Sequence, residues 1–372
     1  MPEYVGAVHL HSCYSDGSGT VREITAAARR AGLDFVVLTD HDTLRPAEDR
    51  WDGWHDGVLV VVGVEVTCQF RSHIVVFGAR EVAALRFKPL RRVLFDLQNQ
   101  GAVAFVAHAQ PAHIMGYSMK AGELTDWEVA GFAGVELWSF MHDICDGMAP
   151  WRIPSFIRNW PQRVRGPNAT TVAHWDRVTA WRRFPAVGSL DNHAFIVPGL
   201  GAAILSYDDG FRTLRTHVLA QECTGRRDDA RLITDTLCRG RAFIALDMLA
   251  DARGFRFFSE STAALVLRSE EASLLRRVAS RRIRPIPQNE ADAGGQRLEM
   301  GDEAPYAGPA VLEVRSPVEA KLTLLRAGRP VAETVGTALR HTAAEPGVYR
   351  AEARLGGKPW VYTNPIYLWA NV

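Results

Sequence analysis

A series of short, continuously apolar runs constrains the fold of this chain more than any other feature. They lie at residues 5–10, 34–39, 58–66, 73–77, 101–107, 134–138 and 186–189. Continuous apolar strands are typical of a parallel sheet that is buried on both faces. Helical patterns separate several runs: Thr20 and Glu23 form a predicted capping box, and Gly32 follows the predicted helix. Strands spaced by helices favour an α/β fold, either a barrel or a doubly wound sheet.

The pattern changes after about residue 254, where short β-prone segments alternate with turn residues. These segments lie at 255–258, 264–268, 310–315, 320–326, 347–354 and 360–369. With 372 residues, the chain is long enough for two domains. We therefore predict a barrel domain over 1–252 and a small C-terminal β-sandwich over 253–372. A stretch rich in Trp, Pro and Arg, about 141–183, is predicted to be a functional insertion.

Composition excludes several classes of protein. The 43 Lys and Arg residues nearly balance 42 Asp and Glu, so the net charge is +1 and general nucleic-acid binding is not expected. No apolar run has the length of a membrane span, and no secretory signal pattern is present. The five cysteines are scattered without CxxC spacing, which favours free thiols and a cytoplasmic location.

Histidines and carboxylates collect at the ends of the predicted strands. The set comprises His9, His11, Asp16, His41, Glu65, His73, His108, Asp191 and His193. Because the carboxyl ends of strands meet at one face of a barrel or sheet, we expect these side chains to converge. Nitrogen and oxygen donors without cysteine suit Zn, Mn or Fe, and nine donors exceed the needs of one tetrahedral ion. The sequence therefore predicts two or three divalent metal ions.

Each motif alone also has a purely structural interpretation. An HxH pair often marks a buried, hydrogen-bonded histidine, and Ser15-Asp16-Gly17 is an ordinary turn sequence. Five such motifs at successive strand ends are not explained by core histidines, so the metal site is the favoured interpretation.

The motifs resemble, in order and spacing, those of the PHP (polymerase and histidinol phosphatase) superfamily. They are residues 9–17 (HLHSCYSDG), 39–42 (TDHD), 63–65 (GVE), 107–108 (AH) and 188–193 (GSLDNH). The resemblance covers about residues 5–250 and implies a distorted (β/α)7 barrel with a trinuclear metal centre. It implies three ion sites: His9, His11, Glu65 and Asp191; Glu65, His73 and His108; and Asp16, His41 and His193. Two motifs depart from the family pattern: Ala109 and Gln110 follow His108, and Leu190 and Asn192 flank Asp191.

The order of a PHP-type barrel and a C-terminal β-domain also resembles the carbaryl-hydrolase-like branch of PHP metallohydrolases. That resemblance implies cleavage of a carbamate or an aryl ester. It is looser than the first, so both kinds of substrate stay open.

The expected mechanism uses a metal-bound hydroxide, because bound metal ions lower the pKa of water from 15.7 to about 7. Asp191 is the predicted proton acceptor, and His193 or His113 would protonate the leaving oxygen. Asp40 is predicted to orient a ligating imidazole from behind. Arg158 and Arg241, together with His113, are candidate substrate-binding residues, since phosphoryl oxygens need cationic or forked donors.

Three functions follow from these observations. The leading hypothesis is a phosphoesterase that acts on a small phosphate ester. The alternative is a carboxylic-ester or carbamate hydrolase with the same metal site, which the Trp-rich insertion favours. The third is a metal-binding scaffold without turnover. A small-molecule substrate is expected in the first two cases, and the sequence leaves the oligomeric state open.

Overall fold

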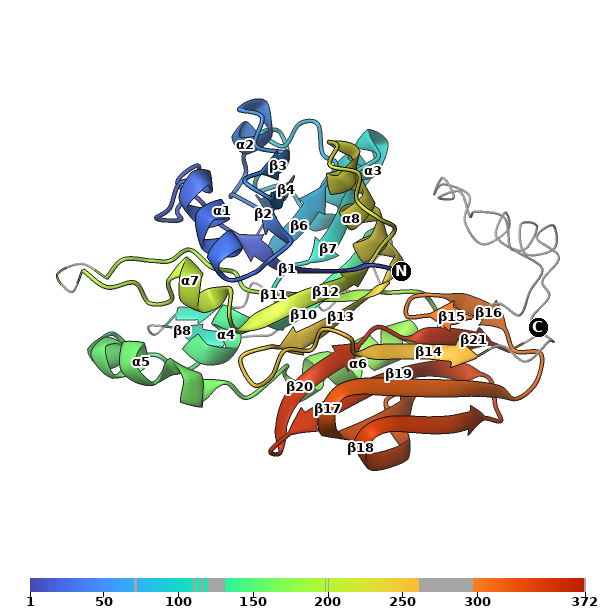
Figure 1. Cartoon of the computed structure of the whole chain (residues 1–372). Helices are drawn as coiled ribbons and strands as arrows, with labels where there is room; N and C mark the ends of the chain where they lie inside the picture. The colour runs from blue at the N-terminus through green and yellow to red at the C-terminus, as the bar shows by residue number, and fades with distance from the viewer. Residues whose placement is uncertain are drawn as a thin grey trace.

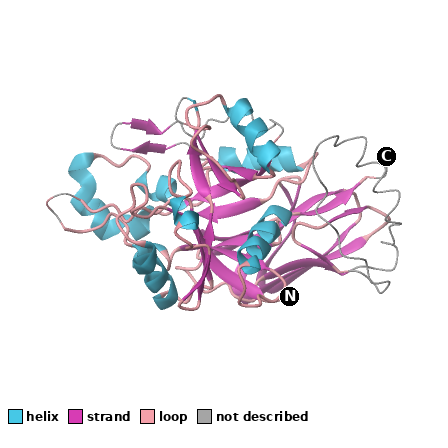
Figure 2. Ribbon diagram, turned by 90° about the horizontal axis from the view of Figure 1, so that it is seen from above, coloured by secondary structure: helices cyan, strands magenta, loops and turns pink. Residues whose placement is uncertain are grey.

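The fold mixes α and β structure in the first two-thirds of the chain and is almost entirely β in the last third (Figure 1). The computed structural model describes residues 1–69, 72–109, 112–114, 117–119, 131–197, 199, 201–260 and 297–370. Seen from above, helices lie around the strands of the first part, and the far end of the molecule is built of strands (Figure 2). Within this described part, no helix is both long and apolar enough to cross a membrane.

One sheet begins with strands from the N-terminal region. These are β1 (Glu3–Leu10), β2 (Phe35–Leu38), β3 (Gly53–His55), β4 (Val58–Val62), β12 (Leu214–Leu219) and β13 (Ala242–Leu246). β1, β2 and β4 are parallel to one another, whereas β12 runs antiparallel to β1 and pairs with β13. The predicted runs at 5–10 and 34–39 are therefore strands, and both are buried as expected.

A second sheet contains the remaining strands of this region. They are β5 (Val64–Thr67), β6 (His73–Phe77), β7 (Val103–Val106), β10 (Phe132–Ser139) and β11 (Ala186–Ser189). Their order is β11-β10-β7-β6-β5. The two sheets meet at two isolated bridges, Leu10 with Asn192 and His41 with Glu65. His9, His11 and Asp191 lie at one of these junctions, and Glu65 lies at the other.

The mixed α/β class is confirmed, but a (β/α)7 barrel is not, because the two sheets do not close into a continuous ring. β5, β6 and β7 are antiparallel neighbours, which interrupts the expected parallel repeat. Only five residues connect β5 to β6, too few for the helical crossover that a parallel pair requires.

The helices follow the local sequence signals. They are α1 (Val21–Arg30), α2 (Arg45–Glu48), α3 (Leu90–Gln100), α4 (Phe140–Cys145), α5 (Ile153–Asn159), α6 (Ala169–Thr179), α7 (Tyr207–Gly210) and α8 (Asp228–Arg239), with 3₁₀ turns at Pro150–Arg152 and Trp160–Arg163. The capping box of Thr20 and Glu23 is present at α1. The Trp-rich stretch folds into α4, α5 and α6 and the two 3₁₀ turns. Trp138, just before this stretch, and Trp175 within it are completely buried, so core packing accounts for both.

The last third of the chain forms antiparallel strands around a separate apolar core. The strands are β14 (Arg256–Glu260), β15 (Leu298–Glu299), β16 (Glu303–Pro305), β17 (Ala310–Arg326), β18 (Arg329–Ala343), β19 (Gly347–Leu355), β20 (Lys358–Thr363) and β21 (Ile366–Trp369), with β16 and β21 as a parallel pair. Leu312, Leu322 and Trp360 are buried in this core. β20 pairs with β13, so these strands continue the first sheet. The predicted strand at 264–268 lies outside the described residues, and the boundary near residue 252 stays a prediction.

Candidate metal centre

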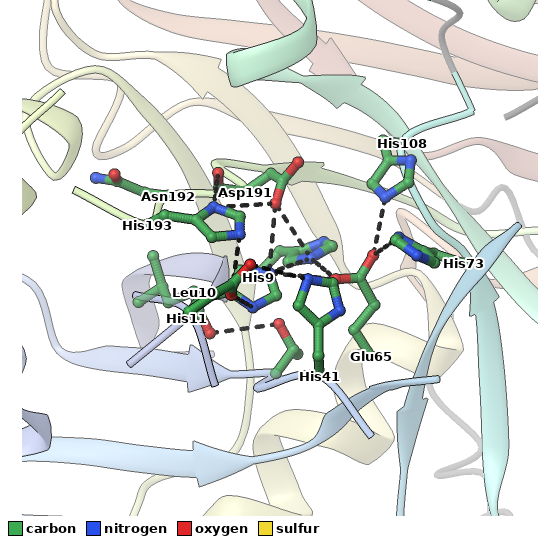
Figure 3. A network of polar contacts seen from close by, with 12 residues as sticks. His9, Leu10, His11, His41, Glu65, His73, His108, Asp191, Asn192 and His193 are labelled. Atoms are coloured by element: carbon green, nitrogen blue, oxygen red, sulfur yellow. Dashed lines mark hydrogen bonds and ion pairs between the residues drawn. The ribbon is translucent and has the colours of Figure 1, made fainter. Parts of the chain in front are cut away.

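The candidate ligands converge where β1, β5 and β11 end or meet (Figure 3). The backbone there is unusual: His9, His108 and Asp191 have φ values of 66°, 25° and 51°. Residues other than glycine rarely adopt positive φ, and such strain is concentrated at functional sites. Three of the predicted ligands are thus strained, and so are Asp42 and Ala194, the residues that follow His41 and His193.

The first cluster is formed by His9, His11, Glu65 and Asp191, all of which are buried. The Oε2 atom of Glu65 lies 3.1 Å from Nε2 of His9 and 3.2 Å from Nε2 of His11. The Oδ1 atom of Asp191 lies 3.5 and 3.4 Å from the same two nitrogens. Two imidazoles and two carboxylates therefore direct single donor atoms at one small volume.

A second group surrounds the other oxygen of Glu65. Its Oε1 atom lies 2.9 Å from Nδ1 of His73 and 2.8 Å from Nε2 of His108. Glu65 is thus placed between two groups of imidazoles, as a bridging carboxylate would be.

A third group gathers around Asp16 on the more exposed side. Its carboxylate oxygens lie 3.6 Å from Nδ1 of His11, 3.6 Å from Nε2 of His41 and 3.4 Å from Nε2 of His193. The structure therefore brings together all nine predicted donor residues.

The donor set fits divalent metal ions. Glu65 Oε2 is buried and has no hydrogen-bond partner within the described part of the chain, yet nitrogens of His9, His11 and His41 lie 3.1 to 3.2 Å away. A buried carboxylate oxygen without a hydrogen bond is costly unless a cation satisfies it. Imidazole nitrogens and carboxylate oxygens without sulfur suit Zn, Mn or Fe.

His142 is a candidate ligand that the sequence analysis missed. It is buried on α4, its ring stacks on that of His108 at a centroid distance of 4.5 Å, and its Nε2 lies 3.8 Å from Oδ2 of Asp191. These three residues form a further group whose donor atoms lie within 4.8 Å of one another. The signal for it in the sequence is its position three residues beyond the carboxyl end of β10, within the stretch predicted to be an insertion.

Two buried carboxylates support the ligands from behind. Glu136 Oε1 lies 2.7 Å from Nδ1 of His9, and its Oε2 accepts a hydrogen bond of 2.7 Å from the backbone N–H of His108. Asp40 instead accepts hydrogen bonds from Ser12 and Ser15 and so fixes the loop between His11 and Asp16. Asp40 was predicted to orient a ligating imidazole, but the carboxylate that contacts the imidazole of His9 is Glu136.

The carboxylates and imidazoles of the cluster strongly perturb one another. Burial lowers the pKa of His9, but Glu136 and Glu65 outweigh this and raise it well above its usual value. Burial also opposes ionisation of Glu65, yet His9 and His73 hold its pKa well below the usual range. The pKa of Asp191 is lowered well below its usual range in the same way, against burial and chiefly by His9. Carboxylates that stay ionised in a buried site need compensating positive charge, from protons or from metal ions.

The predicted substrate-binding residues lie apart from the cluster. His113 is mostly exposed and its nearest ionic partner is Asp146, at 3.9 Å. Arg158 is exposed on α5. Arg241 pairs with Asp302 at 2.8 Å and lies beside Leu219, at the amino end of β1 and therefore opposite to the metal ligands. No contact joins any of the three to the cluster within the described residues.

Comparison with known proteins gives one family match. Residues 7–142 match the model of the PHP domain. The search of curated proteins found no match.

Several solved structures are similar at low identity. A two-domain protein from Bacteroides vulgatus, described as containing a predicted PHP-like metal-dependent phosphoesterase, is 17% identical, with 98% of this chain and 95% of that chain covered and a TM-score of 0.43. PsfC from Pseudomonas syringae is 16% identical, with coverages of 63% and 97% and a TM-score of 0.39. A candidate metal-dependent phosphoesterase from Bifidobacterium adolescentis is 15% identical, with coverages of 53% and 92% and a TM-score of 0.35. At these low identities and TM-scores, the similarity to these structures carries no information on function.

Proposed function

Since the chain contains a PHP domain, we propose that it is a metal-dependent hydrolase that cleaves a small phosphate ester. One observation carries the proposal: the buried carboxylate of Glu65 lies within 3.2 Å of nitrogens from five histidines. They are His9, His11, His41, His73 and His108. An ionised carboxylate has about four acceptor sites, whereas five imidazoles surround this one, and such an excess of imidazoles suits a centre of several metal ions.

The proposed ligand sets follow the distances. His9, His11, Glu65 and Asp191 would hold one ion, and Glu65, His73 and His108 would hold a second. Asp16, His41 and His193 would hold a third, and His142 adds a donor between His108 and Asp191. Two or three ions of Zn, Mn or Fe fit these donors.

When bound, such ions polarise the ester and make water a nucleophile at neutral pH. The chain's own residues handle the protons. Asp191 turns Oδ1 to His9 and His11, while its Oδ2 lies closer to His142, so Oδ2 is the atom proposed to accept the proton of the attacking water. His193 lies between Asp191 and Asp16 and is partly exposed, so in a two-ion form, in which it is not a ligand, it is proposed to transfer a proton to the leaving oxygen.

A scaffold without turnover is the less favoured interpretation. Asp16, His41 and His193 are partly exposed, whereas His9 and His11 are buried. One side of the cluster is therefore open to a substrate, which a purely structural metal site does not require.

A carboxylic-ester or carbamate hydrolase is the second candidate. Phe195 and Ile196 lie two and three residues after His193 and are about half exposed. Exposed apolar side chains beside a candidate ligand would suit an apolar acyl or aryl group.

The test is a screen of the protein loaded separately with Zn, Mn and Fe. Aryl phosphate monoesters and diesters would be compared with aryl acetates and carbamates, for the wild type and for His9→Ala and Asp191→Ala. His341→Ala, on β18, is the control for loss of a histidine away from the cluster. We expect phosphate ester turnover that both site variants abolish and the control retains. Turnover of acyl substrates alone would refute the phosphoesterase, and full activity of His9→Ala would refute the site.

A further inference from the structure

The candidate metal centre is buried at its middle and exposed at Asp16 and His41. The side chains of His9, His11 and Glu65 are at most 1% exposed, whereas those of Asp16 and His41 are 57% and 26% exposed. A substrate can therefore approach across the rim that Asp16 and His41 form.

Arg86 reaches this rim through Asp42, the residue after His41. Its Nε lies 3.0 Å from Oδ2 of Asp42. Asp42 is fixed to the site by two further bonds: its backbone N–H donates to the carbonyl oxygen of Glu65, and its Oδ1 accepts from the backbone N–H of Thr67. Thr67 in turn pairs with His73 across the sheet. Asp42 thus holds the Arg86 guanidinium next to the segment that carries His41 and beside β5, which carries Glu65.

The guanidinium is free to bind something else. The side chain of Arg86 is 57% exposed, and only Nε is engaged within the described residues, so both terminal amino groups are available. The ring of Phe87 lies under it, 4.7 Å from the guanidinium carbon. Phe87 is itself 54% exposed and has a φ of 59°, a conformation that is strained for a bulky residue. Exposed aromatic surface and backbone strain together beside a site are costly for stability, which points to a role in binding.

We propose that Arg86 anchors the phosphoryl group of the substrate, which makes the substrate a phosphate monoester. This inference rests on the proposed function. The two terminal amino groups form a planar fork that matches two phosphoryl oxygens. A monoester has a third non-bridging oxygen to present to the metal centre, whereas a diester has only two in all. Two other arginines are engaged elsewhere: Arg163 donates to two backbone carbonyls, and Arg241 pairs with Asp302.

Arg92 offers a matched control on the surface of α3. The Nε of Arg92 also lies 3.0 Å from a carboxylate oxygen, here of Asp96, and its side chain is 61% exposed. The ring of Phe95 lies 5.8 Å from its guanidinium carbon. It therefore reproduces the charge, pairing and exposure of Arg86 without the position at the rim. Arg86→Met and Arg92→Met remove the same charge and keep a similar aliphatic stem.

The first measurement is binding of inorganic phosphate to the Mn-loaded protein by calorimetry, with metal content checked for each variant. We expect Arg86→Met to weaken phosphate binding about tenfold to a hundredfold, as for loss of a charge-assisted hydrogen bond in a binding site. Arg86→Lys should recover only part of the affinity, and Arg92→Met should match the wild type. Unchanged binding in Arg86→Met, equal losses in both methionine variants, or no phosphate binding by the wild type would each overturn the inference.

The second measurement separates this inference from the proposed function. With an aryl phosphate monoester, Arg86→Met should raise KM more than it lowers kcat, while kcat/KM for any aryl acetate turnover should not change. If the wild type cleaves no ester but binds phosphate through Arg86, the hydrolase proposal fails and the anchor stands. If phosphate esters are cleaved and the KM of Arg86→Met equals that of the wild type, the anchor fails alone.

Discussion

Substitution of Glu136 by Gln should weaken metal binding without touching a ligand. Glu136 is completely buried and accepts two hydrogen bonds of 2.7 Å, one at His9 Nδ1 and one from the backbone N–H of His108. With Nδ1 donating its proton, Nε2 of His9 is left as a free donor atom facing Glu65. A glutamine has a single carbonyl oxygen, so its NH₂ group must face one of the two N–H donors.

The magnitude follows from this mismatch. One buried hydrogen bond is lost and two donors face each other, which should cost about 1 to 3 kcal/mol of the unfolding free energy of the metal-free protein. Loss of the carboxylate behind a ligating histidine typically lowers metal affinity about 10- to 100-fold. Urea unfolding and Zn competition against a chelator would measure the two effects, with Glu48→Gln on the exposed side of α2 as the control. Zn affinity within twofold of the wild type would refute the inference that Glu136 orients His9.

Three further predictions concern stability and the ligand loop. Arg350 Nε lies 2.6 Å from Oδ1 of the largely buried Asp176, so Arg350→Met leaves that carboxylate without its partner. The unfolding free energy measured in urea titrations should fall by about 3 to 5 kcal/mol. A loss below about 1 kcal/mol would contradict this. Burial raises the pKa of Glu3, but the hydrogen bond with His217 outweighs burial and lowers the pKa to about 2. Burial lowers the pKa of His217, but its partners Asp247 and Glu3 outweigh burial and raise that pKa. Glu3 should therefore contribute stability that is complete above about pH 4.5 and is lost as the pH falls towards 2. His217 contributes stability below about pH 6.5 that is lost as the pH rises through its folded pKa, so His217→Gln should flatten that alkaline loss in urea midpoints measured against pH. Gly17→Ala would place a Cβ 2.2 Å from the backbone carbonyl oxygen of His11, in the loop between His11 and Asp16. Metal analysis should therefore show one metal equivalent fewer per chain than in the wild type. Full metal occupancy would show that the loop can shift freely.

The candidate donors could be located from the sequence because strand ends are marked by local signals. A run such as Val103–Val106 ends where apolar residues give way to His108, and parallel strands bring such ends together. His142 lies three residues beyond the end of β10, on a short helix rather than at the strand end itself, and inside the stretch predicted to be an insertion. The substrate-binding predictions for Arg158 and Arg241 rested on residue type alone, and residue type carries no information on which end of a strand a side chain occupies.

Strand prediction failed where burial did not follow hydrophobicity. β18 was not predicted, because its side chains are mostly exposed on both faces and it is held by pairing with β17. β12 contains His217, a polar residue that is buried only because Glu3 and Asp247 provide ionic partners. Neither strand presents the continuous apolar run that identified β1 and β2.

Closure of the barrel also could not be read from local patterns. A helix capping box or an apolar run reports one element, whereas closure depends on the direction in which each strand returns. The short connection after Thr67 reverses the chain, so β6 runs antiparallel to both of its neighbours. The apolar pattern of β6 would be the same in either direction, because burial on both faces does not depend on strand direction.

The number of metal ions and the class of substrate are linked through charge. Three carboxylates, those of Asp16, Glu65 and Asp191, lie among the proposed ligands. Two divalent ions would exceed their charge by one, and three would exceed it by three. A phosphate monoester dianion can offset such an excess, whereas a neutral carboxylic ester or carbamate cannot. Because uncompensated charge is costly in a largely buried site, a fully loaded centre favours an anionic substrate. The Arg86 and Asp42 pair adds a donor fork at the rim with little net charge, since the two side chains neutralise each other. A loaded centre that rejects phosphate would therefore contradict both the three-ion assignment and the phosphoesterase.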